Sequence, residues 1–474
     1  MLLFATLALI ACTRAHAADT VIANGPPGSF RLDDRGDALD AHDGDLQSFN
    51  GRYYFYGSSY GCGFQWNKKG APFCGFRVYS SPDLTTWHDE GALFDADVPA
   101  WQKRCNGETY GCYRPHVVYN ARTRAYVLWI NSYDVGVGYH VFTAKTPTGP
   151  FVETALPTLA INRGVPAGLN HGDHDVFVDR DGVAYLAYTD WRAKGDIVIE
   201  RLDADYTSGT GQYVRLGLKS TEAPSLFRRG ENYYVTYSDP NCGYCATGTS
   251  YLRASSPWGP WSGRSDAADT SEAQQHRGLP LGKDSCGGQP ADVATLPGRD
   301  EPVFLYQSDR WHHADVNEGL ATHYWEPLRF GADGAISPLT CADTFSVPLI
   351  TRADAPASAP VAALELTPGG ERVQVVAVVR EGGHGTIPLT LFRRGDGDGA
   401  LQVRVWRKQS DGKPGELLAV RVFRADELSW APRVQKLPVA ARFETGEAVV
   451  VSLRATKASP VYGTLTGERH TQAR

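Results

Sequence analysis

Three acidic segments of this chain share one layout, and each could supply a carboxyl group for acid–base chemistry. In each segment an acid stands about ten residues before a strand-like run that is rich in aromatic residues. The acids are Asp43 before YYFYGSS, Asp173 before AYLAYTD and Glu222 before YYVTYSD. A lone acid is more often structural than catalytic. The threefold repetition therefore favours a shared functional role for these three.

Hydrolysis of a glycosidic bond requires two carboxyl groups. One protonates the leaving oxygen, and the other activates a water molecule or attacks the anomeric carbon. A third acid close to the first raises its pKa by like-charge repulsion, so that the first stays protonated near neutral pH. Three acids with one layout fit a sugar-cleaving site of this kind.

The elements that must position these acids are short aromatic strands. Five such runs recur along the chain, starting at Tyr53, Tyr126, Ala184, Tyr233 and Val303. Radial β-repeats recur at intervals of this size, and several blades around one axis bury sheets that a single repeat cannot. The acids lie 130 and 49 residues apart in sequence, so only a closed ring brings them together. We expect an all-β fold with a five-bladed β-propeller over residues 18–345.

The pattern changes after a linker at residues 346–360, which is rich in small residues and proline. Beyond it, apolar residues alternate with period two between Gly- and Asp-rich turns, which predicts strands. Residues 361–474 are expected to form a C-terminal β-sandwich of jelly-roll type. This region holds few aromatic residues, so a structural accessory role is at least as well supported as sugar binding.

Composition limits the class of partner. The net charge of −6 argues against binding nucleic acid by bulk charge. After the N-terminus no apolar run reaches the roughly 18 residues of a membrane span. The histidines near the acids lack a familiar metal-ligand spacing, so we predict no metal and no cofactor. The expected partner is an oligo- or polysaccharide substrate, and a monomer is expected.

The N-terminus predicts export. Residues 1–17 resemble a signal peptide, with a small-x-small cleavage site at Ala15-His16-Ala17. A lipoprotein anchored through Cys12 is the alternative, and the expected location is secreted or periplasmic. The eight other cysteines predict disulfides. The pairs expected from proximity or from the blade order are Cys62 with Cys74, Cys105 with Cys112, Cys242 with Cys245, and Cys286 with Cys341.

The three acidic segments resemble glycoside hydrolase family 43, the five-bladed propeller glycosidases. The resemblance covers most of residues 38–345 and implies an inverting mechanism on a terminal sugar. On the family pattern Asp43 is the general base and Asp173 modulates the pKa of the acid. Glu222, in Glu222-Ala-Pro224, is the general acid.

A finer resemblance is to the exo-β-1,3-galactanase branch of this family. It rests on Ala41 to Asp45, on Arg114-Pro115, and on blade-five segments that include Gln289, Asp309-Arg310-Trp311 and Tyr324-Trp325. That branch usually lacks the Asp base and is thought to use the blade-five Gln, whereas this chain has both Asp43 and Gln289. The branch also has a sugar-contacting Glu where Tyr113 stands here.

Aromatic residues near the axis would stack on the apolar face of a sugar, and polar ones would bind its hydroxyls. The expected substrate-binding residues are His42, Tyr113, Arg114, Trp191, Gln289, Asp309, Arg310, Trp311 and Trp325. The predicted function is an exported, exo-acting glycosidase that releases terminal sugars from plant side-chain glycans. A β-1,3-galactosidase or galactanase is favoured. An α-L-arabinofuranosidase, a β-xylosidase and an inactive carbohydrate-binding propeller are the alternatives.

Overall fold

A computed structural model describes residues 18–109, 111–133, 138–154, 156–162, 171–264, 276–314, 316–351, 359–381, 384–444, 446–456 and 460–465. The predicted signal peptide, Cys12 and part of the predicted linker lie outside these residues. Over the described residues the chain is all-β apart from short 3₁₀ turns and one α-helix, α1 (Pro99–Cys105). The predicted all-β class is confirmed. No helix within the described ranges has the length and apolarity to cross a membrane.

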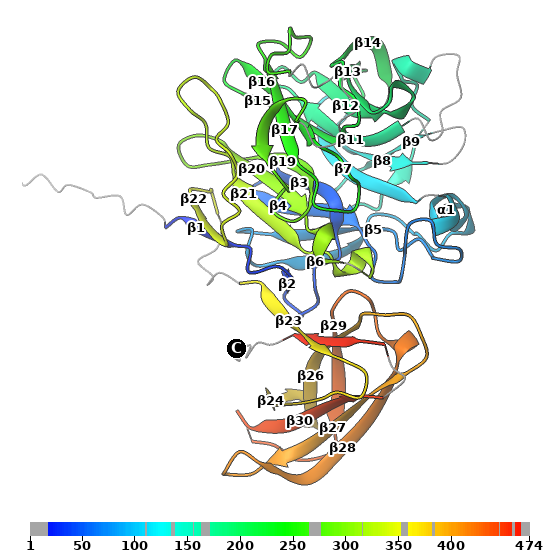
Figure 1. Ribbon diagram of the computed structural model, residues 1–474, viewed down its shortest axis with the longest axis vertical. Helices are drawn as coiled ribbons and strands as arrows, with labels where there is room; N and C mark the ends of the chain where they lie inside the picture. The colour runs from blue at the N-terminus through cyan, green and yellow to red at the C-terminus, as the bar shows by residue number, and fades with distance from the viewer. Residues whose placement is uncertain are drawn as a thin grey trace, which may run out of the picture.

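Five antiparallel sheets follow one another along the chain, and each begins with its innermost strand (Figure 1). Sheet one holds β3 (His42–Phe49), β4 (Arg52–Ser58), β5 (Phe76–Ser81) and β6 (His88–Ala92). Sheet two holds β7 (Cys112–Asn120), β8 (Ala125–Ser132), β9 (Tyr139–Ala144) and β10 (Val152–Glu153). Sheet three holds β11 (His171–Val178), β12 (Ala184–Asp190), β13 (Asp196–Leu202) and β14 (Gly209–Arg215). Sheet four holds β15 (Glu222–Arg229), β16 (Asn232–Ser238), β17 (Thr249–Ala254) and β18 (Leu279–Gly282). Sheet five holds β19 (Gln289–Leu296), β20 (Val303–Asp309) and β21 (His323–Pro327).

The five sheets form a closed ring of blades. Each innermost strand packs against the next, from β3 through β7, β11 and β15 to β19, and β19 packs back against β3. The five aromatic runs are the second strands, and their alternating side chains fill the apolar layers between neighbouring blades. Outside the ring, β1 (Thr20–Ala23) pairs with β22 (Thr344–Val347) and joins the two ends of the propeller region.

The C-terminal residues form two further sheets, drawn in yellow to red in the lower part of Figure 1. One contains β23 (Val361–Leu366), β25 (Val379–Glu381), β26 (His384–Arg393), β29 (Arg433–Val439) and β31 (Tyr462–Leu465). The other contains β24 (Glu371–Ala377), β27 (Ala400–Lys408), β28 (Pro414–Arg424) and β30 (Ala448–Ala455). Apolar residues of both sheets share one core.

The N-terminal segment belongs partly to this C-terminal region. The short strand β2 (Ser29–Phe30) pairs with β23, so a residue range assigned to the propeller by sequence adds a strand to a C-terminal sheet. The carbonyl of Gly61 accepts hydrogen bonds from the backbone N of Trp430 at 3.1 Å and from Oγ of Ser429 at 2.8 Å. The two parts of the molecule are therefore docked by backbone pairing and by side chains.

Four disulfides stabilise the loops, and all four predicted pairs are present: Cys62–Cys74, Cys105–Cys112, Cys242–Cys245 and Cys286–Cys341. Disulfides persist in oxidising compartments, so they agree with an extracellular protein.

Candidate active site

Every innermost strand has a register shift against its partner strand near its N-terminal end. The register with the second strand shifts after His42 in β3, after Tyr113 in β7, after His171 in β11, after Glu222 in β15 and after Pro290 in β19. A bulge adds residues to one strand and turns their side chains in a new direction. All five blades therefore share a bulge near the start of the innermost strand, and the bulges change the direction of the side chains at this end of the ring axis.

Two of the bulged positions have a left-handed backbone and carry candidate site residues. The φ angle is 50° at Asp43 and 56° at Arg114. Glycine adopts this region most readily, and Asp tolerates it better than most residues because its short side chain bonds locally. The backbone at Asp43 is thus held in a conformation that the rest of β3 does not share.

The predicted acids meet side chains from the other blades at this mouth. Nη2 of Arg114 donates to Oδ2 of Asp173 at 3.0 Å, and Nη1 donates to the carbonyl of Pro290 at 3.2 Å. Nε2 of Gln289 donates to Oε1 of Glu222 at 2.7 Å. Arg114 and Asp173 also act electrostatically on both other acids.

The environment raises the pKa of both Asp43 and Glu222. Burial raises the pKa of Asp43 to about 7; Asp309 and Asp173 add to the rise and Arg114 opposes it. Burial also raises the pKa of Glu222 to about 8, with the charge of Asp173 as the next cause. Two neighbouring carboxyls whose pKa values are both raised are typical of a functional site.

Gln289 fixes the orientation of the Glu222 carboxyl. Its amide nitrogen donates to Oε1, and Asn241 forms a second side-chain hydrogen bond with the same carboxyl. Gln289 is therefore a hydrogen-bond partner of Glu222, the predicted acid.

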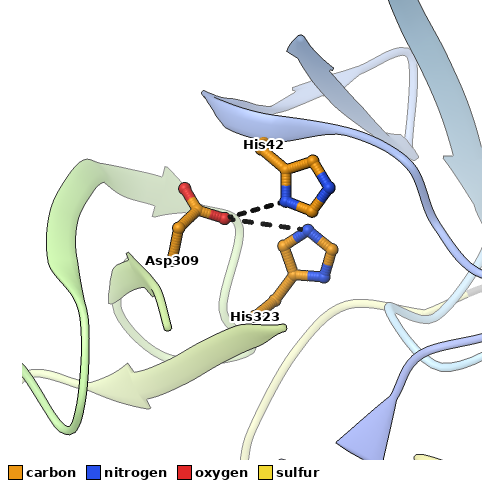
Figure 2. Close-up of side chains that lie close together, drawn as sticks. All are labelled: His42, Asp309 and His323. Carbon is orange, nitrogen blue, oxygen red and sulfur yellow. Dashed lines mark ion pairs between the residues drawn. The ribbon is translucent and has the colours of Figure 1, made fainter. Parts of the chain in front are cut away.

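A second buried group, His42, Asp309 and His323, adjoins Asp43, the predicted base (Figure 2). Oδ1 of Asp309 lies 3.6 Å from Nδ1 of His42 and 3.8 Å from Nε2 of His323. A metal ion would need a lone pair on that Nε2. However, this atom lies 2.7 Å from the carbonyl of Ala41, which can only accept, so Nε2 carries a hydrogen. The donor set therefore does not fit a metal.

The same three side chains fit a charge network instead. Burial alone would lower the pKa of His42, but the carboxylates of Asp309 and Asp40 raise it to about 9. Burial lowers the pKa of His323 to about 4, so this ring is neutral at pH 7. His42 and Asp309 are thus a buried ion pair beside a neutral imidazole.

The other predicted substrate-binding residues divide into two groups. Trp311 and Tyr113 belong to one buried aromatic cluster beside Asp43, and Trp191 is half-buried in a 3₁₀ turn after β12.

Arg310 and Trp325 are occupied by the protein itself. The guanidinium of Arg310 donates to two backbone carbonyls and lies 4.9 Å from the ring centre of Tyr324. Trp325 is 1% exposed in the core, and Arg31 covers its ring at 3.9 Å. Neither side chain is available to a sugar in this structure.

Sequence reasoning missed three residues that surround the acids. The hydroxyl of Tyr60 donates to Oδ2 of Asp43 at 3.1 Å. Asn241 hydrogen-bonds Glu222, and Tyr244 is 39% exposed with its ring edge-on to Trp311 at 5.2 Å. The only sequence signal for the last two was the C-x-x-C loop that carries them.

Beneath the acids lies a polar cavity of about 10 Å³, lined by Asp43, Arg114, His116, His174, Asp175 and Asp292 among others. That volume holds about one water molecule. Asp45, Asp175 and Asp292 surround the axis here, and we refer to them as the axial acids. Burial raises the pKa of each of them.

Comparisons with known proteins agree with this architecture. Residues 37–281, slightly more than half of the chain, match the model of glycosyl hydrolases family 43. A β-D-galactofuranosidase of Aspergillus niger is 28% identical over 225 residues, which cover 44% of this chain and 63% of that protein. A non-reducing end α-L-arabinofuranosidase of Bacteroides ovatus is 29% identical over 198 residues, which cover 40% and 34%. The chain spans less than two thirds of either relative.

Solved structures share the fold over nearly the whole chain. An exo-β-1,3-galactanase from Clostridium thermocellum has a TM-score of 0.54 at 19% identity and covers 95% of this chain and 100% of its own. An exo-β-1,3-galactanase from Phanerochaete chrysosporium with bound β-1,3-galactotriose has a TM-score of 0.53 at 21% identity and covers 94% and 98%. At these identities the likeness concerns the fold alone.

Proposed function

Because the chain belongs to glycosyl hydrolase family 43, we propose that it is an exported, exo-acting glycosidase that hydrolyses O-glycosyl bonds with inversion. The observation that carries the proposal is the cluster at one end of the ring axis, where Arg114 binds Asp173, Gln289 binds Glu222, and the pKa values of Asp43 and Glu222 are both raised. In this proposal Asp43 is the ionised base and Glu222 the protonated acid, and the charge of Asp173 favours the protonated form of Glu222. Both groups are then in the state that catalysis needs.

In this mechanism Glu222 protonates the glycosidic oxygen as the bond to the anomeric carbon breaks. Asp43 takes a proton from a water molecule, which attacks the opposite face of the sugar. Asp173 keeps Glu222 protonated through like-charge repulsion. Arg114 pairs with Asp173 and moderates the field on both other acids.

The favoured substrate class is a terminal β-1,3-linked galactoside of a plant side-chain glycan. It is supported by the shared fold of two exo-β-1,3-galactanases and by the residues that resemble that branch. A terminal furanoside is the second candidate, because the curated relatives are named as a galactofuranosidase and an arabinofuranosidase. A β-xyloside is the remaining alternative within the family.

A panel of aryl glycosides tests the activity and the sugar together. It contains the β-D-galactopyranoside, β-D-galactofuranoside, α-L-arabinofuranoside and β-D-xyloside, with β-1,3-galactobiose as a natural linkage. We expect turnover of the galactopyranoside and the disaccharide, and ¹H NMR should show the α-anomer of galactose forming first. Turnover of none of these substrates would favour the inactive carbohydrate-binding propeller.

For the remaining parts of the molecule we propose a sandwich-type accessory domain at residues 361–474 and a monomer. Secretion, or anchoring through Cys12, is proposed from the N-terminal pattern and agrees with the four disulfides.

A further inference from the structure

The C-terminal sheets reach the segment that leads into the catalytic base. Strand β29 begins at Arg433, whose Nη1 lies 3.3 Å from Oδ2 of Asp37 and whose Nη2 lies 3.6 Å from Oδ2 of Asp40. The backbone N of Val434 donates to Asp37 at 2.6 Å. The start of β29 is therefore fixed to residues just before β3, the strand that carries Asp43.

Asp40 connects Arg433 to the candidate site. It is 3% exposed, and its Oδ1 lies 3.5 Å from Nε2 of His42. The same oxygen accepts from the backbone N of Tyr60 at 2.9 Å, and Oδ2 accepts from the backbone N of Gly61 at 3.0 Å. One buried carboxylate thus organises the two neighbours of the base, His42 and Tyr60.

Two paths then converge on Asp43. In the first, His42 lies against Asp309, and Oδ2 of Asp309 accepts from the backbone N of Asp43 at 2.7 Å (Figure 2). In the second, the hydroxyl of Tyr60 donates to the carboxylate of Asp43 at 3.1 Å. The ring of His42 stacks on those of Tyr60 and His323 at 5.3 and 5.2 Å, so both paths share one packed centre.

The charges along the first path alternate in sign from the C-terminal sheet to the base. We call this series the charge relay; its members are Arg433, Asp40, His42 and Asp309. Each buried charge is compensated by the next, and removing one leaves another uncompensated. The relay ends on a backbone N–H whose residue has a φ of 50°, a conformation that persists only when its surroundings hold it.

We propose that the C-terminal domain is a positioning part of the catalytic site, which holds Asp43 in its working conformation through the charge relay. The inference rests on the proposed function, in which Asp43 is the base. Displacement of a catalytic group by about 1 Å costs a rate on the order of 100-fold. The relay therefore gives a residue of the C-terminal domain influence over the chemical step without contact with the sugar.

The test compares three purified full-length variants on the substrate that the panel identifies. Arg433→Met removes the charge at the start of the relay, Arg433→Lys keeps it, and Arg393→Met is the matched control. Arg393 belongs to the same domain and stacks on Trp430 at 4.6 Å, close to Gly61, but has no contact with Asp40 among the described residues. We expect Arg433→Met to lower kcat by about 10-fold with KM within about 2-fold.

Arg433→Lys should recover most of that loss, and Arg393→Met should keep the kcat of the wild type. An unchanged kcat in Arg433→Met overturns the proposal. An equal loss in Arg393→Met also overturns it, because loosened docking rather than the relay would then be the cause.

Asp309→Asn provides a readout that a merely structural role would not move. The amide oxygen can still accept from the N–H of Asp43, but one of the two negative charges that add to the raised pKa of Asp43 is gone. The acid limb of the pH–rate profile should therefore move to lower pH. An unmoved limb would contradict electrostatic coupling between Asp309 and the base.

Failure of the proposed function would give other results than failure of the charge relay. If the wild type turns over substrate and Asp43→Asn does too, the base assignment is wrong while the effect of Arg433→Met can still be read. If the wild type turns over nothing, a crystal structure of Arg433→Met decides. We expect the Tyr60 hydroxyl to lose its hydrogen bond to Asp43, and an undisturbed bond overturns the relay.

Discussion

With Asp43 as the proposed base and Glu222 as the proposed acid, the activity should depend on the protonation state of both carboxyls. The base must be ionised, which requires a pH above its pKa of about 7. The acid must be protonated, which requires a pH below its pKa of about 8. We expect a bell-shaped profile of kcat/KM with its maximum between these values.

We expect Asp173 to set the upper limb of that profile. Its charge is the second cause, after burial, of the raised pKa of Glu222. In Asp173→Asn the repulsion is lost, so the pKa of Glu222 falls and the alkaline limb moves to lower pH. Asp181→Asn, in an exposed turn after β11, is the control and should leave both limbs in place. A stationary limb in Asp173→Asn would mean that Asp173 does not tune the acid.

The choice of base is a second question at the level of single residues. Asp43 can accept a proton once it is ionised, whereas Gln289 could do so only as a rare tautomer. We expect Asp43→Asn to lose at least ~10²-fold in kcat. Gln289→Ala should lose less, through disorientation of Glu222. Azide should partly restore turnover by Asp43→Gly as an external nucleophile. If Gln289→Ala loses more activity than Asp43→Asn, Gln289 is the more important group for activating the water.

At the scale of strands, the bulges are the elements on which the site depends. Gly44 follows Asp43 in the bulge of β3, and a Cβ there would lie 1.8 Å from the carbonyl oxygen of Tyr56 in β4. A backbone carbonyl in a strand cannot move aside to relieve this clash as a flexible side chain can. Gly44→Ala should therefore cost about 1–3 kcal/mol of stability or more, measured by chemical unfolding.

Gly331→Ala is the matched control for that variant, because the nearest atom to its added Cβ is in the side chain of Asp333. It should stay close to the wild type. Equal stability of both variants would show that the bulge in β3 adapts more easily than its geometry indicates.

The strands also explain what could be read from the sequence. Aromatic alternation was sufficient to predict the five sheets, because it is repeated and local. The layout of the acids led to Asp43, Asp173 and Glu222, whose catalytic roles stay predictions. The bulges were not visible, since a register shift depends on the partner strand. Trp325 was misleading because an aromatic residue in a blade can face the core as readily as the axis. Asp309 was predicted to bind a sugar. In the structure it accepts a hydrogen bond from the backbone N of Asp43, which lies 266 residues away in sequence, so no local pattern could indicate this contact.

For the whole molecule, the axial acids make stability depend on pH. Burial raises the pKa of Asp292 to about 6, above the value of about 3.9 expected in an unfolded chain. The folded state then binds more protons than the unfolded state. The contribution of this group is fully present below pH 4 and is lost as pH rises through about 6.

Asp292→Asn should remove that contribution. Between pH 4 and pH 7 the free energy of unfolding should fall less steeply with pH in the variant than in the wild type. Chemical denaturation at a series of pH values measures the two slopes. Identical slopes would mean that Asp292 titrates alike in the folded and unfolded chains.

The ring closure has a consequence for the time at which the protein becomes competent. The base is made early during synthesis, whereas its anchor Asp309 belongs to the fifth blade and Arg433 to a strand that is made later still. A nascent chain that already carries all three carboxylates would therefore leave Asp43 without the partners that hold it. Because the last strands complete the support of the first, the protein should become active only after translation has reached the C-terminal sheets.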